Sequence, residues 1–180
     1  MTAAELCSGL LLAEGSRLLL DDQATPLEYV DTLITAQSYQ DAVSVLARAL
    51  PMRECVWWAC FCARNCPEFG SNAENDAAVL AAEKWVGDSS EKNRYKAFEA
   101  SQLVRPGAAA NCAAMAAFMC GPSMAPAGEK KCPPPPGLDA QLAAGAVIIA
   151  SIAEGSEKAP ERYIYFIEQG KQLYQSAMSA

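Results

Sequence analysis

Alanine is the feature that most restricts what this 180-residue chain can fold into. The sequence contains 35 alanines, against only 18 valines, isoleucines and threonines together. Alanine has the highest helix propensity, whereas β-branched residues favour strands. No stretch between turn signals alternates apolar and polar residues as a half-buried strand would. The composition therefore predicts an all-α protein.

Helix-start signals divide the chain into short helices. Thr25-Pro26-Leu27-Glu28 has the form of a capping box with proline at the first helical position. Ser71 with Glu74, and Asp88 with Glu91, give two further starts of the same kind. We expect about eight short helices, one starting at residue 26 and the others over residues 38–50, 51–65, 73–86, 89–104, 106–119, 139–153 and 160–178.

These helices predict a single domain over residues 1–180, because the chain is long enough for one core and cramped for two. We expect a single-domain bundle, either irregular or a HEAT-like two-layer helical stack. Residues 1–24 are expected to be a loosely packed N-terminal segment, in which residues 3–14 can form a helix and Leu18-Leu19-Leu20 can pack against the core. Residues 120–137 are rich in proline and glycine, which favours a long crossover connection.

Composition also excludes several classes of function. The chain has no histidine, so a Ser-His-Asp triad, a Cys-His pair and an HExxH metal site are excluded. A net charge of −7 argues against a dedicated binder of nucleic acid or of anionic membranes, since phosphate affinity rests on clustered positive charge. Adjacent carboxylates such as Asp21-Asp22 are interpreted as solvated flanking charges. We therefore expect no catalytic residues, no cofactor and no enzymatic activity.

The eight cysteines are interpreted as reduced thiols in a cytoplasmic protein. We expect no secretory signal, and the longest apolar and small-residue run, 142–153, is too short to span a membrane. Cys55, Cys60, Cys62 and Cys66 form a conspicuous cluster, but four thiolates on one straight helix cannot converge on one metal ion. We interpret these cysteines as small buried hydrophobic residues and predict no metal site.

One candidate for partner binding is a stripe on the helix expected over residues 51–65. Its members fall within about 100° of the helix circumference, and tryptophan and arginine are frequent interface hot spots. They are Arg53, Trp57, Cys60, Phe61 and Arg64, and the partner-binding candidates among them are Arg53, Trp57, Phe61 and Arg64. The alternative is internal: the tryptophans fill the core and each arginine pairs with an acidic neighbour such as Glu54 or Glu68. Trp58, on a different side, is predicted to be core.

A second candidate is the proline run within the crossover. It consists of Pro133, Pro134, Pro135 and Pro136, which favour an extended polyproline II conformation. This run is either a stiff connector that carries the chain across the bundle or a recognition segment for a partner.

Several segments also resemble a known family. Residues 50–64 read LPMRECVWWACFCAR, which is similar to the LPxREAVWWACxCAR signature of an uncharacterised bacterial domain family. Residues 88–98 resemble its central helix, and residues 123–126, 133–138 and 159–163 look like its C-terminal half, so that the likeness covers about residues 38–175. Cys55 replaces the alanine of the signature, and Cys120 lies where serine and glycine are usual. The resemblance implies an all-helical protein without established enzymatic activity, whose relatives look like accessory proteins encoded near type VI secretion genes.

Residues and resemblance together lead to one expected function and one alternative. We expect a non-enzymatic protein-binding module, a type VI secretion accessory adaptor or effector co-chaperone whose partner is a secretion cargo or its loading factor. The alternative is an immunity-type inhibitor that binds and blocks a cognate toxin, where the acidity of the chain would complement a basic cleft.

Overall fold

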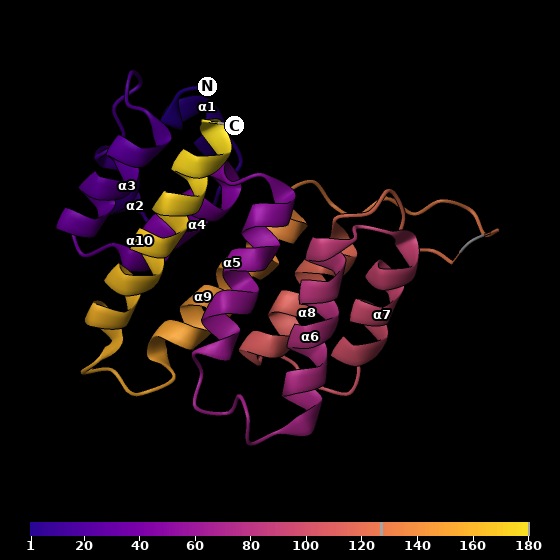
Figure 1. The fold of residues 1–180 in the computed structure, drawn as a ribbon. Helices are drawn as coiled ribbons and strands as arrows, with labels where there is room; N and C mark the ends of the chain where they lie inside the picture. Colours follow the sequence, from indigo (N-terminus) through magenta and orange to yellow (C-terminus); the bar gives the residue numbers. More distant parts are fainter. Residues whose placement is uncertain (127, 180) are drawn as a thin grey trace.

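A computed structural model describes residues 1–126 and 128–179, in which every regular element is a helix (Figure 1). Eight helices have ten residues or more, which confirms the all-α prediction: α3 (Pro26–Thr35), α4 (Tyr39–Ala49), α5 (Met52–Arg64), α6 (Ala73–Gly87), α7 (Glu91–Ser101), α8 (Ala109–Met119), α9 (Leu138–Ile152) and α10 (Ala159–Met178). Two five-residue helices, α1 (Ala3–Cys7) and α2 (Glu14–Leu18), precede them, so the described residues form ten helices rather than about eight.

Local capping explains where the helices begin. The capping box at Thr25 is present: the Thr25 hydroxyl accepts from the Glu28 N–H at 3.3 Å, and the Glu28 carboxylate accepts from the Thr25 N–H at 2.8 Å. Two other expected caps were wrong by one or two residues. Asn72 rather than Ser71 caps α6, and Ser90 rather than Asp88 caps α7.

The start of α8 differs from the sequence prediction for a reason in the backbone. We expected a helix from residue 106, but α8 begins at Ala109. Gly107 has φ +79°, in the left-handed region, and a right-handed helix cannot pass through such a residue. Residues 106–108 are therefore a turn rather than the first turn of the helix.

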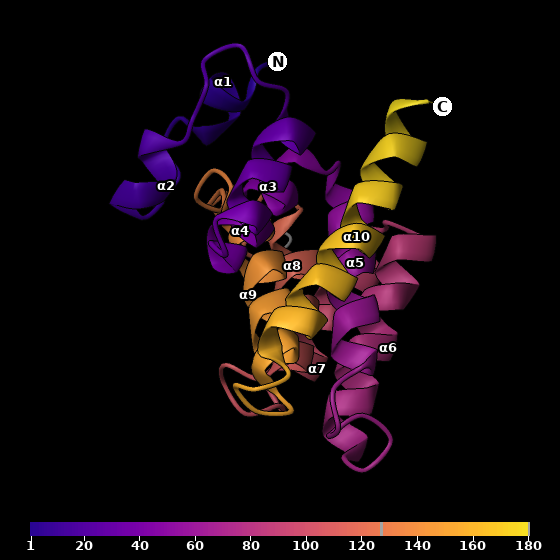
Figure 2. The ribbon, with the colours of Figure 1, turned by 90° about the vertical axis from the view of Figure 1, so that its left-hand side faces the viewer.

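The helices pack in two layers (Figures 1 and 2). One layer contains α10, α5 and α6, and the other contains α4, α9 and α8, with α5 packed on both α8 and α9. Helix α3 covers the α4 end of the molecule, and α7 packs against α6 and α8 at the opposite end. The last helix, α10, packs beside α4, α5 and α9, so the layers are not filled in chain order.

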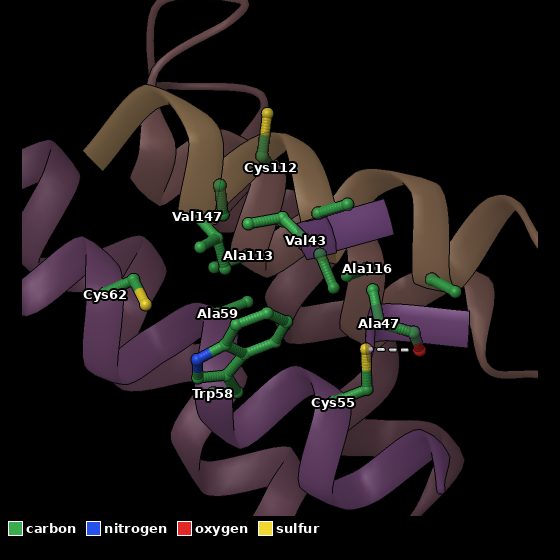
Figure 3. Packing of buried hydrophobic residues seen from close by; sticks show 14 of the residues in the cluster. Val43, Ala47, Cys55, Trp58, Ala59, Cys62, Cys112, Ala113, Ala116 and Val147 are labelled. Atoms are coloured by element: carbon green, nitrogen blue, oxygen red, sulfur yellow. Dashed lines mark hydrogen bonds between the residues drawn. The ribbon is translucent and has the colours of Figure 1, made fainter. Parts of the chain in front are cut away.

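Alanine allows the two layers to approach closely. Ala113, Ala117, Ala143 and Ala146 are fully buried on α8 and α9, which pack against each other. Figure 3 shows residues of α5 facing small side chains from α4, α8 and α9. The propensity that makes these segments helical thus also sets how they pack.

Trp58 is the largest fully buried side chain of the core. Its indole Nε1 donates a hydrogen bond to the Phe166 carbonyl of α10 at 2.8 Å, which confirms the prediction that it is core. Gly170, one turn further along α10, makes room for it: a Cβ there would lie 2.8 Å from both Leu46 Cδ2 and Trp58 Cε2.

The N-terminal segment is anchored in part and exposed in part. Ala3, Leu6 and Cys7 of α1 are buried, but the helix ends at Cys7 rather than near residue 14. Leu18 is 81% exposed and Leu19 is 43% exposed, so two of the three leucines expected to pack on the core do not.

A buried arginine holds the segment between α8 and α9. Arg94 of α7 is 2% exposed, and it donates to the carbonyls of Phe118 at 2.7 Å and Ser123 at 2.8 Å while pairing with Glu91. The Tyr95 hydroxyl donates to the Ala125 carbonyl at 2.6 Å. Residues 128–137 return from beyond α7 to the start of α9 (Figure 1).

Among the described residues, no helix is both long and apolar enough to cross a membrane.

Candidate functional site

The two neighbouring tryptophans of α5 have opposite environments. Trp58 is fully buried, whereas Trp57 is 41% exposed. Successive residues of a helix point about 100° apart, so one faces the core and the other the edge of the layer. The internal alternative therefore holds for Trp58 but not for Trp57.

Trp57 belongs to an exposed aromatic cluster, which we call the aromatic patch and define as Trp57, Phe61 and Tyr165. The rings of Trp57 and Phe61 stack, with centroids 5.6 Å apart and planes 11° apart. The Phe61 ring lies 6.1 Å from Tyr165 of α10, which is 48% exposed. Beneath the patch, the buried Phe166 ring lies nearly perpendicular to the Phe61 ring, with centroids 6.3 Å apart. The patch thus rests on the core at the junction of α5 and α10.

Sequence reasoning identified Trp57 and Phe61 but missed Tyr165. Tyr163, Phe166, Ile167 and Gly170 form the buried apolar stripe of the last helix. Tyr165 lies outside that stripe, and an aromatic side chain on the polar face of an amphipathic helix is the signal that could have revealed it.

The two arginines of the predicted stripe turn away from Trp57 and towards α6. Arg53 donates from Nε and Nη2 to the Val86 carbonyl, at 3.1 and 2.7 Å. Arg64 forms a two-pronged ion pair with Glu83, with Nη2 2.6 Å from Oε2, and its guanidinium lies 4.7 Å from the centre of the Phe69 ring. The acidic partner is thus neither Glu54 nor Glu68. In the described chain the cation–π contacts of the arginines do not include one with Trp57.

These contacts give the arginines a positioning role. Arg53 and Arg64 lie near the two ends of α5 and hold it against α6. Arg64 and Glu83 are 38% and 28% exposed, so solvent weakens their attraction, and a pair of this kind contributes about 1 kcal/mol or less. The aromatic patch therefore stands on a helix that Arg53 and Arg64 hold against α6.

The proline run lies in a different part of the molecule. Pro133, Pro135 and Pro136 are exposed and Pro134 is half-buried. Pro136 lines a cleft of about 400 Å³ between residues 8–11, α4 and α9, in which Arg48 is the one cationic lining residue. The aromatic patch is formed by α5 and α10, in the other layer. The structure therefore does not bring the two predicted binding features together.

The cysteines are mostly part of the core. Cys55, Cys60 and Cys62 are buried, and the Cys55 thiol donates to the Ala47 carbonyl at 3.3 Å (Figure 3). Burial raises the pKa of the Cys62 thiol well above its usual value and that of Cys66 to about 11. Such thiols are neutral at physiological pH and are poor nucleophiles and poor metal ligands. Within residues 1–126 and 128–179, no three His, Cys, Asp or Glu side chains are placed to hold a metal ion together.

Comparisons with known proteins place the chain in a family without assigning it a function. The curated proteins and the solved structures gave no match. The protein families gave a match over residues 29–174, which covers all the long helices except the start of α3 and the end of α10. Only α1, α2 and their connections lie wholly before it. The chain thus belongs to a family of unknown function (DUF6931), in agreement with the resemblance to an uncharacterised family.

Proposed function

We propose that this chain is a non-enzymatic protein-binding module that docks its partner through the aromatic patch. The observation that carries the proposal is that Trp57, 41% exposed, stacks on Phe61 beside the half-exposed Tyr165. Tryptophan and tyrosine are enriched among the residues that dominate binding energy, because they bury a large area at a small cost in conformational entropy.

The support beneath the patch favours binding without rearrangement. Phe61 and Tyr165 both contact Phe166, which is fully buried, and the Phe166 carbonyl accepts the hydrogen bond from Trp58. Surface rings held by such a core lose little further freedom on binding, so more of the contact energy appears as affinity.

The finer identity of the module also belongs to this proposal. The resemblance of residues 50–64 supports an accessory adaptor or effector co-chaperone of type VI secretion, which would hold a cargo or its loading factor in the cytoplasm. The net charge of −7 supports a partner with a basic surface, because opposite charge accelerates encounter and disfavours other acidic proteins.

Partner capture from the native cell lysate tests the proposal. We expect the tagged protein to retain one stoichiometric partner, and the double variant Trp57→Ala/Tyr165→Ala to lose it by about tenfold or more. The matched control is Leu103→Ala/Ile152→Ala, which removes two exposed apolar side chains outside the patch, 67% and 50% exposed. Equal recovery by all three proteins, with unchanged melting temperatures, would remove the patch as the docking site.

A second measurement separates the adaptor from the immunity-type inhibitor. If the captured partner has a toxic activity, an inhibitor abolishes that activity at equal stoichiometry, whereas a co-chaperone leaves it intact.

Arg53 is left unchanged in the capture variants because it bonds the Val86 carbonyl, and its loss would disturb the packing of α5 on α6.

A further inference from the structure

A pocket of about 340 Å³ lies where α3 turns into α4, on a different side of α10 from the aromatic patch. A buried hydroxyl without a partner and a non-glycine residue with positive φ both lie around it, and such features mark functional sites in many proteins. The residues that line it are Ala13, Gln37, Ser38, Tyr39, Gln40, Asp41 and Tyr163.

Tyr163 contributes a buried hydroxyl that lacks a hydrogen bond. The residue is 5% exposed, and its OH is a buried side-chain polar atom without a partner among the described residues. Burial raises the pKa of Tyr163, and the neighbouring Gln40 side chain opposes this shift in part. The Tyr163 ring stacks on Tyr39, with centroids 5.5 Å apart. An unsatisfied buried hydroxyl is costly and therefore calls for an explanation.

Gln37 contributes an unusual backbone. Its φ is +59°, and it is the one non-glycine residue with positive φ in the described chain. The Ser38 N–H bonds the Leu33 carbonyl at 2.8 Å and the Gln37 N–H bonds the Ile34 carbonyl at 2.9 Å, which closes α3 as a Schellman motif. Glycine or asparagine is usual at this position, so Gln37 adopts a backbone conformation that its residue type disfavours.

The start of α4 is the third feature. Ser38 occupies the N-cap position, but its side chain makes no capping hydrogen bond; the starts of α2, α5, α8, α9 and α10 likewise lack a side-chain cap. The first-turn N–H groups of α4 are thus left without a side-chain cap at the pocket. Asp41 in the same turn accepts the Ala13 N–H at 3.2 Å and the Ser16 hydroxyl at 2.5 Å, both through Oδ2.

We propose that this pocket binds an uncharged carboxamide, such as a glutamine or asparagine side chain of a peptide. The amide oxygen would accept from the Tyr163 hydroxyl or the uncapped N–H groups of α4, and the amide NH2 would donate to Asp41 or to the glutamine side chains. The partial positive charge of the α4 N-terminus lies beside the negative Asp41, so a full charge of either sign meets repulsion from one of them. The flat Tyr39 ring offers a wall for a planar amide.

Titration of the purified full-length protein with small probes tests this inference. The probes are N-acetylglutamine methylamide and its glutamate and lysine counterparts, followed by backbone amide chemical shifts. We expect saturable shifts at residues 37–41 with the glutamine probe, and binding about tenfold weaker for both charged probes. No saturable shift at these residues, or tighter binding of a charged probe, would overturn the inference.

A pair of Tyr→Phe variants distinguishes binding from folding. Tyr163→Phe removes the hydroxyl without a partner, so we expect loss of the saturable shifts and an unchanged or higher melting temperature. Tyr95→Phe is the control, because its hydroxyl bonds the Ala125 carbonyl; it should lower the melting temperature by about 2–4 °C and leave the titration unchanged. If Tyr163→Phe lowers the melting temperature as much as the control, the hydroxyl has a partner in the folded protein and the inference fails. The test needs no captured partner, so its outcome is independent of that for the aromatic patch.

Discussion

Trp57 and Trp58 differ by one position in the sequence and by almost everything in their surroundings. Trp58 lies between the two layers, donates a hydrogen bond to α10 and has no exposed surface. Trp57 lies at the edge of the same helix, where its ring stacks on Phe61 and leaves 41% of the residue exposed. The first side chain holds the layers together, and the second is available to another molecule.

The cysteines extend this comparison between the inside and the outside of the molecule. Cys60 and Cys62 share α5 with Trp58 and are buried, whereas Cys132 is exposed. We expect Cys132 to react with a thiol reagent at neutral pH about a thousandfold or more faster than Cys60 or Cys62, whose reaction requires unfolding. Mass spectrometry of partly labelled native protein measures this ratio. Rapid labelling of Cys62 in the native state would mean that the core at α5 opens locally.

Truncation of the two tryptophans tests the comparison directly. Trp58→Ala should lower the free energy of unfolding by about 3–5 kcal/mol, because it opens a cavity and leaves the Phe166 carbonyl without its donor. Trp57→Ala should lower it by about 1 kcal/mol or less, since the ring is already partly in water. Urea denaturation of both variants gives the two values. Similar losses for the two would show that Trp57 supports the fold rather than a partner.

A single methyl group at Gly170 sharpens the account of the Trp58 side. A Cβ there would lie 2.8 Å from Leu46 Cδ2 and from Trp58 Cε2, so Gly170→Ala should destabilise the protein by about 1–3 kcal/mol despite the better helix propensity of alanine. Gly15→Ala in α2 is the matched control, because no atom outside its local backbone lies within 4 Å of the added Cβ. It should be neutral or stabilising by about 0.5–1 kcal/mol. Equal effects would mean that α10 can shift to accept the methyl group.

Much of the fold was readable from short-range patterns. The capping box at Thr25 and the proline near residue 160 placed the starts of α3 and α10, because those signals act within one turn of helix. The same reasoning misplaced the caps of α6 and α7 by one or two residues, since Ser71, Asn72, Asp88 and Ser90 are all capable caps and only the geometry of the chain selects among them. Because Gly107 has a left-handed φ, α8 starts at Ala109 rather than at residue 106.

The candidate binding features were readable only in part. The helical period separated Trp57 from Trp58 and predicted that Trp58 is core, but it left open whether Trp57 would be buried or exposed. The partners of Arg53 and Arg64 lie 33 and 19 residues away, so the acidic neighbours in sequence were the wrong choices. No pattern in the sequence indicated that Arg94 would be buried. It bonds the carbonyls of Phe118 and Ser123, which come within reach of its side chain only in the folded protein.

The sequence by itself determined that this chain is all helix, where most helices start, and that Trp58 belongs to the core, because propensity, capping and helical period depend on residues within about four positions of one another. Only the tertiary structure decided that Trp57 and Tyr165 meet at the surface, that Arg64 pairs with Glu83, and that the Tyr163 hydroxyl is buried without a partner. These outcomes depend on contacts between distant segments, such as the hydrogen bond between Trp58 and Phe166 across 108 residues. Burial and pairing follow from which helices become neighbours, and local pattern does not encode that.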